Sequence, residues 1–208
     1  MSYISAKYIE NLAEKILVEA DVNNPPVKAD NVAEFNCGLE IEWRNLDICE
    51  DKKIVLAAID VRKKKICMNE SQEWELKNNR GRMNFTVAHE LGHWMLHKDF
   101  AQEKLVGFED SVLICRGIDN RIDDRERQAN LFAVYLLMPE RFIRIQLEDF
   151  TSPLSEYDLR LIADAFCVSK QAMRIRLVDE LKLLHYAKGS YCKSKLEAME
   201  AAGQQSLF

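Results

Sequence analysis

Residues 85–93 constrain the fold of this chain more than any other segment, because they read FTVAHELGH and contain the pattern HExxH. His89 and His93 stand four residues apart in it, and Glu90 directly follows His89. On an α-helix, positions i and i+4 share one face about 6 Å apart. Both imidazoles can therefore converge on one Zn²⁺, which takes histidine nitrogens at about 2.0–2.1 Å. The pattern predicts a helix that binds zinc on its histidine face.

The other residues of this helix agree with that prediction. At about 100° per residue, Val87, Leu91 and Trp94 form an apolar stripe opposite the histidines, which favours one buried face and one face open to a cleft. Glu90 is turned away from His89 and suits the general base that reaches a water on the metal in peptide hydrolysis. The alternative is a chance HExxH on a surface helix. The apolar stripe disfavours it, as does a total of only four histidines.

A catalytic zinc site needs three protein ligands and one open position, so a third ligand must come from outside HExxH. His97 continues the histidine stripe, but it lies about 12 Å from His89 along a straight helix. It is better explained as a neighbour of the site, or as a residue at a helix end whose charge suits the dipole. The next helix, predicted over residues 123–138, offers Glu126 as the third ligand. Asn130, one turn later, can hydrogen-bond a ligand histidine and fix its orientation.

Spacing alone leaves the third ligand open. Glu126 can equally be a solvated charge in the acidic first turn of its helix, where carboxylates favour the dipole. Four further carboxylates are rival ligands: Asp123, Asp124, Glu109 and Asp110.

Hydrophobic spacing outside the motif predicts an α+β fold, in which a small antiparallel sheet packs as a meander against a helical majority. A first helix is predicted from about Ile4, and the residues at 23–26 end it. Alternating apolar and polar residues predict strands at 39–43, 54–59 and 65–68. From Asn84, a candidate N-cap, the chain reads as almost entirely helical.

Residues 155–184 read as two helices around a turn at residues 167–169, which resembles a helix-turn-helix. The second helix carries Lys170, Arg174 and Arg176, but the acidic residues of the segment balance its basic ones. A structural or substrate-docking role is therefore favoured over DNA contact. His185 and Tyr186 are candidates for stabilising an oxyanion, against the simpler interpretation as surface residues.

The amino-acid composition indicates which kinds of partner and which cellular compartment to expect. The net charge of −5 argues against bulk electrostatic binding of nucleic acid and favours a basic or neutral polypeptide. The six cysteines occur without a CxxC pair, which is typical of reduced thiols in the cytoplasm. The longest apolar run, residues 131–138, is far shorter than the roughly 20 residues that cross a bilayer, so no membrane association is expected.

Two separated motifs resemble the ImmA/IrrE family of metallo-endopeptidases. The family pattern is F-T-x-A-H-E-x-G-H followed by E-x-x-A-N-x-F-A and an L-L-M-P end, and this chain matches it at residues 85–93, 126–133 and 136–139. The resemblance extends over about residues 27–184. It implies a zincin-like α+β domain with His89, His93 and Glu126 as zinc ligands and Glu90 as the catalytic glutamate. Known members cleave helix-turn-helix repressors of phage, mobile-element or DNA-damage genes, which implies a repressor as the protein substrate.

The resemblance and the spacing together predict how the chain is organised. Residues 1–150 form the zincin-like domain with its N-terminal helix, residues 151–188 form a helix-turn-helix-like segment packed on it, and residues 189–208 form a flexible tail. The chain departs from the family in the 32 residues between His93 and Glu126. Within them, residues 98–120 form a long connection that suits a substrate loop or lid.

Three functions compete on this evidence. The first is a cytoplasmic zinc endopeptidase that makes a site-specific cut in a helix-turn-helix repressor. The second is a regulator that uses a zinc-stabilised fold to bind a partner or DNA without proteolysis, and the third is one half of a toxin-antitoxin pair. The HExxH helix favours the first.

Overall fold

The computed structural model of the protein describes residues 4–46, 55–104, 112–113 and 124–203. The chain divides into two compact units, the first made of residues 1–23 and 27–137 and the second of residues 24–26 and 138–208. The predicted partition at residue 150 assigns α6 (Glu140–Glu148) to the first part of the chain, whereas the contacts place this helix in the second unit.

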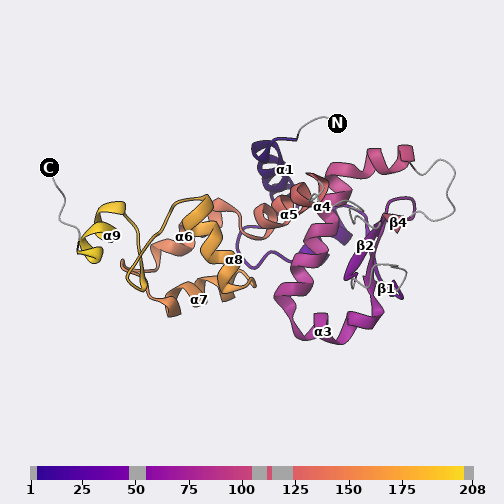
Figure 1. Ribbon diagram of the computed structural model, residues 1–208. Helices are drawn as coiled ribbons and strands as arrows, with labels where there is room; N and C mark the ends of the chain where they lie inside the picture. Colours follow the sequence, from indigo (N-terminus) through magenta and orange to yellow (C-terminus); the bar gives the residue numbers. More distant parts are fainter. Residues whose placement is uncertain (1–3, 47–54, 105–111, 114–123, 204–208) are drawn as a thin grey trace. The chain divides into compact units, whose positions relative to one another are not determined.

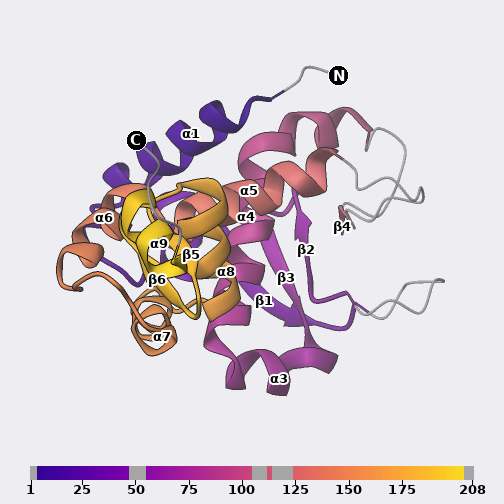
Figure 2. The ribbon, with the colours of Figure 1, turned by 60° about the vertical axis from the view of Figure 1, so that its left-hand side comes forward.

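The first unit contains a four-stranded sheet, seen beside α4 in Figures 1 and 2. Its order is β1 (Glu40–Arg44), β3 (Lys65–Asn69), β2 (Ala57–Asp60) and β4 (Val112–Leu113). β2 and β3 form an antiparallel hairpin, but β1 pairs with β3 in parallel, with Ile41 opposite Ile66. The prediction of an antiparallel meander is therefore wrong for β1. Alternation along a strand identifies its two faces, but it identifies neither the neighbouring strand nor its direction.

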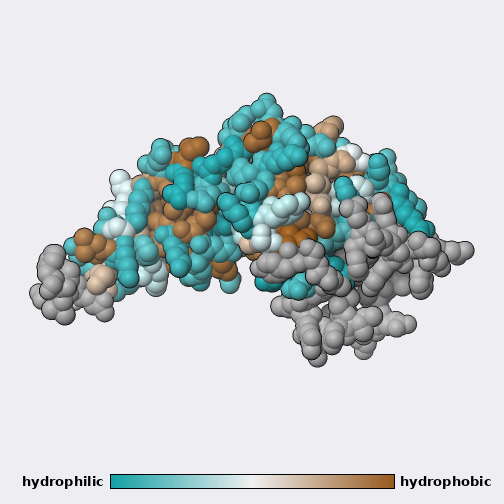
Figure 3. All heavy atoms as spheres, turned by 90° about the horizontal axis from the view of Figure 1, so that it is seen from above, coloured by the Kyte–Doolittle hydropathy of each residue, from teal (hydrophilic) through white to brown (hydrophobic). Residues whose placement is uncertain are grey.

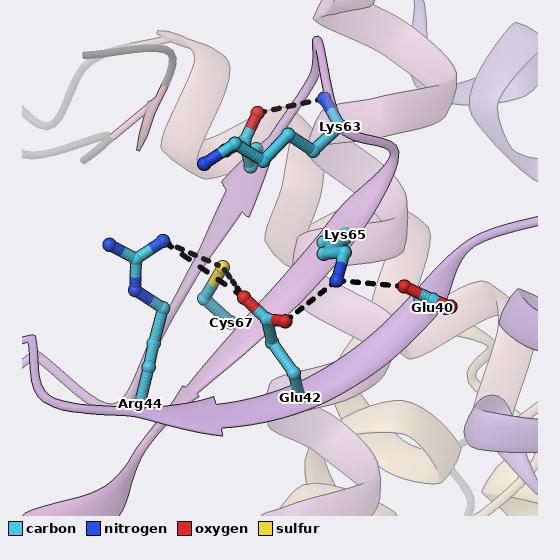
Figure 4. A network of polar contacts seen from close by, with 7 residues as sticks. Glu40, Glu42, Arg44, Lys63, Lys65 and Cys67 are labelled. Carbon is cyan, nitrogen blue, oxygen red and sulfur yellow. Dashed lines mark hydrogen bonds and ion pairs between the residues drawn. The ribbon is translucent and has the colours of Figure 1, made fainter.

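The two faces of this sheet differ in chemistry. Ile59, Ile66 and Met68 are fully buried, as expected for the face that a helix covers, and α4 lies against β2 and β3. On the other face the Nζ of Lys65 lies 2.8 Å from carboxylate oxygens of both Glu40 and Glu42. Figure 4 shows these pairs, together with the Cys67 and Arg44 contacts of Glu42. The same face also carries the buried Ala58 and Cys67, so it is polar only in part.

Helix α4 (Arg80–Lys104) carries the HExxH motif and begins earlier than predicted. Asn79 caps it, since its side chain accepts a hydrogen bond from the backbone N–H of Arg82. The prediction of Asn84 as N-cap is thus wrong. Asn84 lies inside the helix, where its amide accepts from the N–H of Ala29 and donates to the carbonyl of Val27, both at 2.8 Å. Through these two hydrogen bonds Asn84 connects residues 27–29, which precede β1, to helix α4.

The remaining helices of the first unit surround α4. Helix α5 (Asp124–Leu137) packs along α4, and α1 (Ala6–Glu19) packs on α5. Shorter elements complete the unit: α2 (Ala29–Asn31), a π-helix (Val32–Asn36), a 3-10 turn (Glu70–Gln72) and α3 (Glu73–Asn78). The helix-rich composition with a small sheet agrees with the predicted α+β class.

The second unit contains the predicted helix-turn-helix-like segment. Helix α7 (Glu156–Ala165) begins with a capping box between Ser155 and Asp158. It is followed by a turn with Cys167 at positive φ, then by α8 (Lys170–Arg174) and a π-helix (Ile175–Glu180). Both predicted helices and their turn are present.

The C-terminal residues differ from the flexible tail that the sequence led us to expect. Strands β5 (His185–Ala187) and β6 (Ser190–Cys192) form a hairpin, and α9 (Lys195–Ala202) follows. Polar contacts order this region: the backbone N–H of Lys193 donates to Ser152, and the Nζ of Lys193 donates to the carbonyl of Leu147 at 2.6 Å. These contacts join residues 41 and 46 positions apart in the sequence, and hydrophobic periodicity, which is a local pattern, does not predict such contacts.

Among the described residues, no helix combines the length and the apolar character needed to span a membrane. The face of the molecule in Figure 3 is mostly hydrophilic, with smaller hydrophobic areas between the hydrophilic ones.

Candidate metal centre

Helix α4 places the two histidines of HExxH on one face, one turn apart. Their Nε2 atoms lie 3.0 Å from each other, and their rings meet edge to face. His93 is fully buried, whereas His89 is partly accessible. Two ring nitrogens converge on one point here.

Helix α5 brings Glu126 to the same point. One of its carboxylate oxygens lies 3.4 Å from the Nε2 of His89, and the other lies 3.3 Å from the Nε2 of His93. Ligand atoms about 2.0–2.1 Å from a tetrahedral ion lie roughly 3.3 Å apart, so these separations suit a shared metal ion. Among the described residues, His89, His93 and Glu126 form the group able to hold one.

A second observation supports a metal ion between His89, His93 and Glu126. The Oε1 of Glu126 is buried and makes no hydrogen bond, although it faces His93. A buried carboxylate oxygen without a hydrogen bond is costly, and a cation between the three side chains removes that cost. The rival ligand Asp124 lies in the first turn of α5, where it pairs with Arg127. Asp123, Glu109 and Asp110 lie outside the described residues, as does most of the predicted loop at 98–120.

The close approach of α4 and α5 depends on Gly92, the fourth residue of HExxH. A Cβ at this position would lie 3.1 Å from both the Cα and the carbonyl oxygen of Ala129, and 3.2 Å from the Cβ of Phe132. A side chain at residue 92 would therefore require its neighbours on α5 to move by a few tenths of an ångström. The sequence holds a signal for this close approach that the predictions above do not use: a glycine inside one motif and an alanine inside the other.

Asn130 lies beside the ligand set. Its Oδ1 is 3.0 Å from the Nδ1 of His89. Since an amide oxygen only accepts, the contact assigns the Nδ1 proton to His89 and leaves the Nε2 lone pair for a metal. Asn130 can therefore hold His89 in the tautomer that a ligand needs.

His97 lies one turn beyond His93 and is also buried. Its ring contacts the ring of His93, with centroids 5.6 Å apart. Its Nε2 points to the carbonyl of Arg125, 3.4 Å away. Helix rise keeps this ring away from the point where the Nε2 atoms of His89 and His93 meet.

The electrostatics of the site separate its two glutamates. Burial raises the pKa of Glu126, but the nearby imidazoles of His89 and His93 outweigh it and lower that pKa to about 2. Burial raises the pKa of Glu90, and the neighbouring histidines only partly offset it. Glu126 is therefore a carboxylate ready to bind a cation, whereas Glu90 has an increased affinity for a proton.

His185 and Tyr186 lie in β5 of the second unit. Their part in stabilising an oxyanion stays a prediction.

Comparison with known proteins adds a family and a fold. The family model described as the IrrE N-terminal-like domain, of the peptidase M78 family, matches residues 75–178, half of the chain. A search of curated proteins finds no match. Among solved structures, a Mycobacterium tuberculosis transcriptional regulator is similar in fold, with a TM-score of 0.53 and 17% sequence identity. The alignment covers 85% of this chain and 48% of that one, so the present chain spans about half the length of that structure.

Proposed function

This chain belongs to the peptidase M78 family of IrrE N-terminal-like domains, and from that membership we propose that it is a zinc-dependent endopeptidase. The match confirms the family that the two motifs predict. The observation that carries the proposal is the convergence of His89, His93 and Glu126 from two facing helices, with the buried Glu90 next to His89. A helix with HExxH lying against a small sheet also supports a zincin-like fold for the first unit.

The proposed mechanism assigns one task to each side chain. His89, His93 and Glu126 hold Zn²⁺, which when bound lowers the pKa of water toward about 7 and polarises a carbonyl. Glu90 accepts the proton of the attacking water and passes it to the departing amine. Asn130 keeps His89 oriented.

The proposed substrate is a helix-turn-helix repressor, cut at one site in the cytoplasm. Repressors of this kind present basic surfaces to DNA, and a chain with a net charge of −5 is suited to a basic partner. The similar solved structure is named a transcriptional regulator, which agrees with a role in gene regulation.

A cleavage assay with two variants tests the proposal. The protein is incubated with Zn²⁺ and a helix-turn-helix repressor, chosen first from any encoded by neighbouring genes, and the products are analysed by mass spectrometry. We expect one cut, abolished by a chelator and restored by zinc. Glu90→Gln should retain zinc and lose cleavage, whereas Glu34→Gln, which removes the same charge from an exposed site, should cleave normally. Cleavage by Glu90→Gln at the wild-type rate would refute the mechanism.

DNA binding without proteolysis is the competing function, and the second unit argues against it. The basic side chains of the second helix are paired with acids: Lys170 with Glu156 at 2.7 Å, Arg174 with Asp179 at 3.8 Å and Arg176 with Glu180 at 2.9 Å. Contact with phosphates would have to displace these acids. Salt-sensitive binding of duplex DNA that Glu90→Gln leaves unchanged would favour the competing function.

A further inference from the structure

We infer that His97 is a positioning residue that fixes Glu126 in the ligand set by holding the backbone of Arg125. The inference rests on the proposed function, because it concerns the same metal centre. His97 is buried, and the proposed mechanism gives it no role. The inference supplies one.

Three contacts from α4 fix the part of α5 that carries Glu126. His97 reaches the carbonyl of Arg125, the residue before Glu126. Gly92 allows van der Waals contact with the backbone of Ala129, three residues after it. His89 meets the side chain of Asn130, four residues after it. Glu126 therefore lies between two fixed backbone points, and His97 supplies the one on its N-terminal side.

A contact that fixes the backbone has more effect at the N-terminal end of α5 than in the middle of the helix. α5 begins at Asp124, so Glu126 lies in its first turn, where backbone N–H groups lack partners within the helix and the ends fray. The carbonyl of Arg125 has two lone pairs, and a helical N–H uses only one. The Nε2–H of His97 can donate to the other.

The burial of His97 supports a specific contact over simple filling of space. Only 6% of the residue is exposed, and a buried imidazole N–H without a partner is unfavourable. An apolar residue would fill the same space at lower cost. A histidine at this position is explained if its hydrogen bond to the carbonyl of Arg125 fixes the start of α5.

The test measures metal binding, so that it does not depend on finding a substrate. His97→Leu keeps most of the volume and removes the donor, whereas His97→Gln places an amide N–H near the position of Nε2. Zn²⁺ affinity is measured by competition with a chelating dye, and Co²⁺ absorption reports coordination, since four-coordinate Co²⁺ absorbs visible light more strongly than five- or six-coordinate Co²⁺. Val87→Ala, on the buried stripe opposite the histidines, is the control for lost packing.

We expect His97→Leu to weaken Zn²⁺ binding by about 10- to 100-fold, the usual effect of removing a residue that supports a ligand. It should also reduce the Co²⁺ absorption. His97→Gln should recover most of the Zn²⁺ affinity and most of the Co²⁺ absorption. Val87→Ala should lower the melting temperature and leave the Co²⁺ spectrum unchanged. If His97→Leu fails to fold, His97→Asn, whose amide is too short to reach Arg125, takes its place.

A double-mutant cycle shows whether His97 acts through Glu126. In the Glu126→Ala background, His97→Leu should weaken Co²⁺ binding by less than about twofold, because the ligand it positions is gone. An equal loss in both backgrounds would overturn the inference and assign the effect to the ring contact with His93. A wild-type spectrum and affinity in His97→Leu would overturn it as well, while the proposed function would stand. Failure of the wild-type protein to bind either metal would instead contradict the proposed function, and this inference with it.

Discussion

Gly92 of α4 and Ala129 of α5 lie so close that a single methyl group on Gly92 would stand 3.1 Å from the Cα and the carbonyl oxygen of Ala129. Gly92 belongs to HExxH, and Ala129 lies between Glu126 and Asn130 on α5. The two motifs of the sequence therefore meet backbone to backbone. The distance between the two histidines and Glu126 depends on this contact.

Gly92→Ala should lower both stability and metal affinity. Overpacking typically costs about 1–3 kcal/mol, and the gain in helix propensity returns about 1 kcal/mol, so we expect a net loss of up to about 2 kcal/mol. Zn²⁺ affinity should fall by at least about tenfold as Glu126 moves away. Trp43, Trp74 and Trp94 all lie in the first unit, so tryptophan fluorescence in urea reports its unfolding.

A second substitution checks the cause of the loss in Gly92→Ala. Adding Ala129→Gly should not restore stability, because the contacts involve the backbone of Ala129 and not its methyl group. Greater stability of Gly92→Ala than of wild type, with unchanged Zn²⁺ affinity, would show that the helices do not meet in this way.

Asn130→Ala should weaken Zn²⁺ binding by about 10- to 100-fold, because His89 loses the acceptor that fixes its tautomer. Asn130→Asp keeps an acceptor oxygen and should bind zinc at least as well as the alanine variant, and close to wild type. Arg127→Ala is a control on the exposed side of the same helix and should leave the affinity unchanged. Competition with a chelating dye measures all three. Wild-type affinity in Asn130→Ala would remove Asn130 from the site.

Whether a feature of this structure could be predicted from the sequence depends on which interactions produce it and on how far apart in the chain the interacting residues lie. The shared face of His89 and His93 could be predicted because helix periodicity converts sequence spacing into a common side of the helix. Spacing left the third ligand open, and the choice of Glu126 came from the family resemblance. The parallel pairing of β1 and the start of α4 at Arg80 could not, because the first depends on strand order and the second on a local cap at Asn79. The bond from His97 to Arg125 also escapes prediction, since it requires knowing how two helices cross.

Zinc should stabilise the first unit in proportion to the logarithm of its free concentration. A ligand that binds only the folded state adds about 2.7 kcal/mol at 100 times its Kd and about 4.1 kcal/mol at 1,000 times. The urea midpoint followed by tryptophan fluorescence should therefore rise with Zn²⁺ and return to its original value with a chelator. Glu126→Gln should shift the same curve to higher zinc concentrations. A midpoint independent of zinc would exclude a metal centre that forms only in the folded protein.

Glu156 should stabilise the second unit at neutral pH and lose this effect in acid. Its carboxylate accepts hydrogen bonds from Lys170 and from the hydroxyl of Tyr191, both at 2.7 Å, and these bonds lower its pKa below the ordinary value of 4.5. A group whose pKa is lower in the folded state contributes its stability above the unfolded pKa and loses it as the pH falls through the folded pKa. Glu156→Gln should therefore be less stable than wild type at pH 7, and the difference should shrink below about pH 4.5.

Hydrogen exchange of peptides from α7 and β6 measures this difference in the unit that contains both partners. Glu148→Gln, an exposed glutamate of the same unit, is the matched control and should show little difference from wild type at either pH. If Glu156→Gln and wild type differed by the same amount at pH 7 and pH 3.5, the ionised carboxylate could not be the source of the effect.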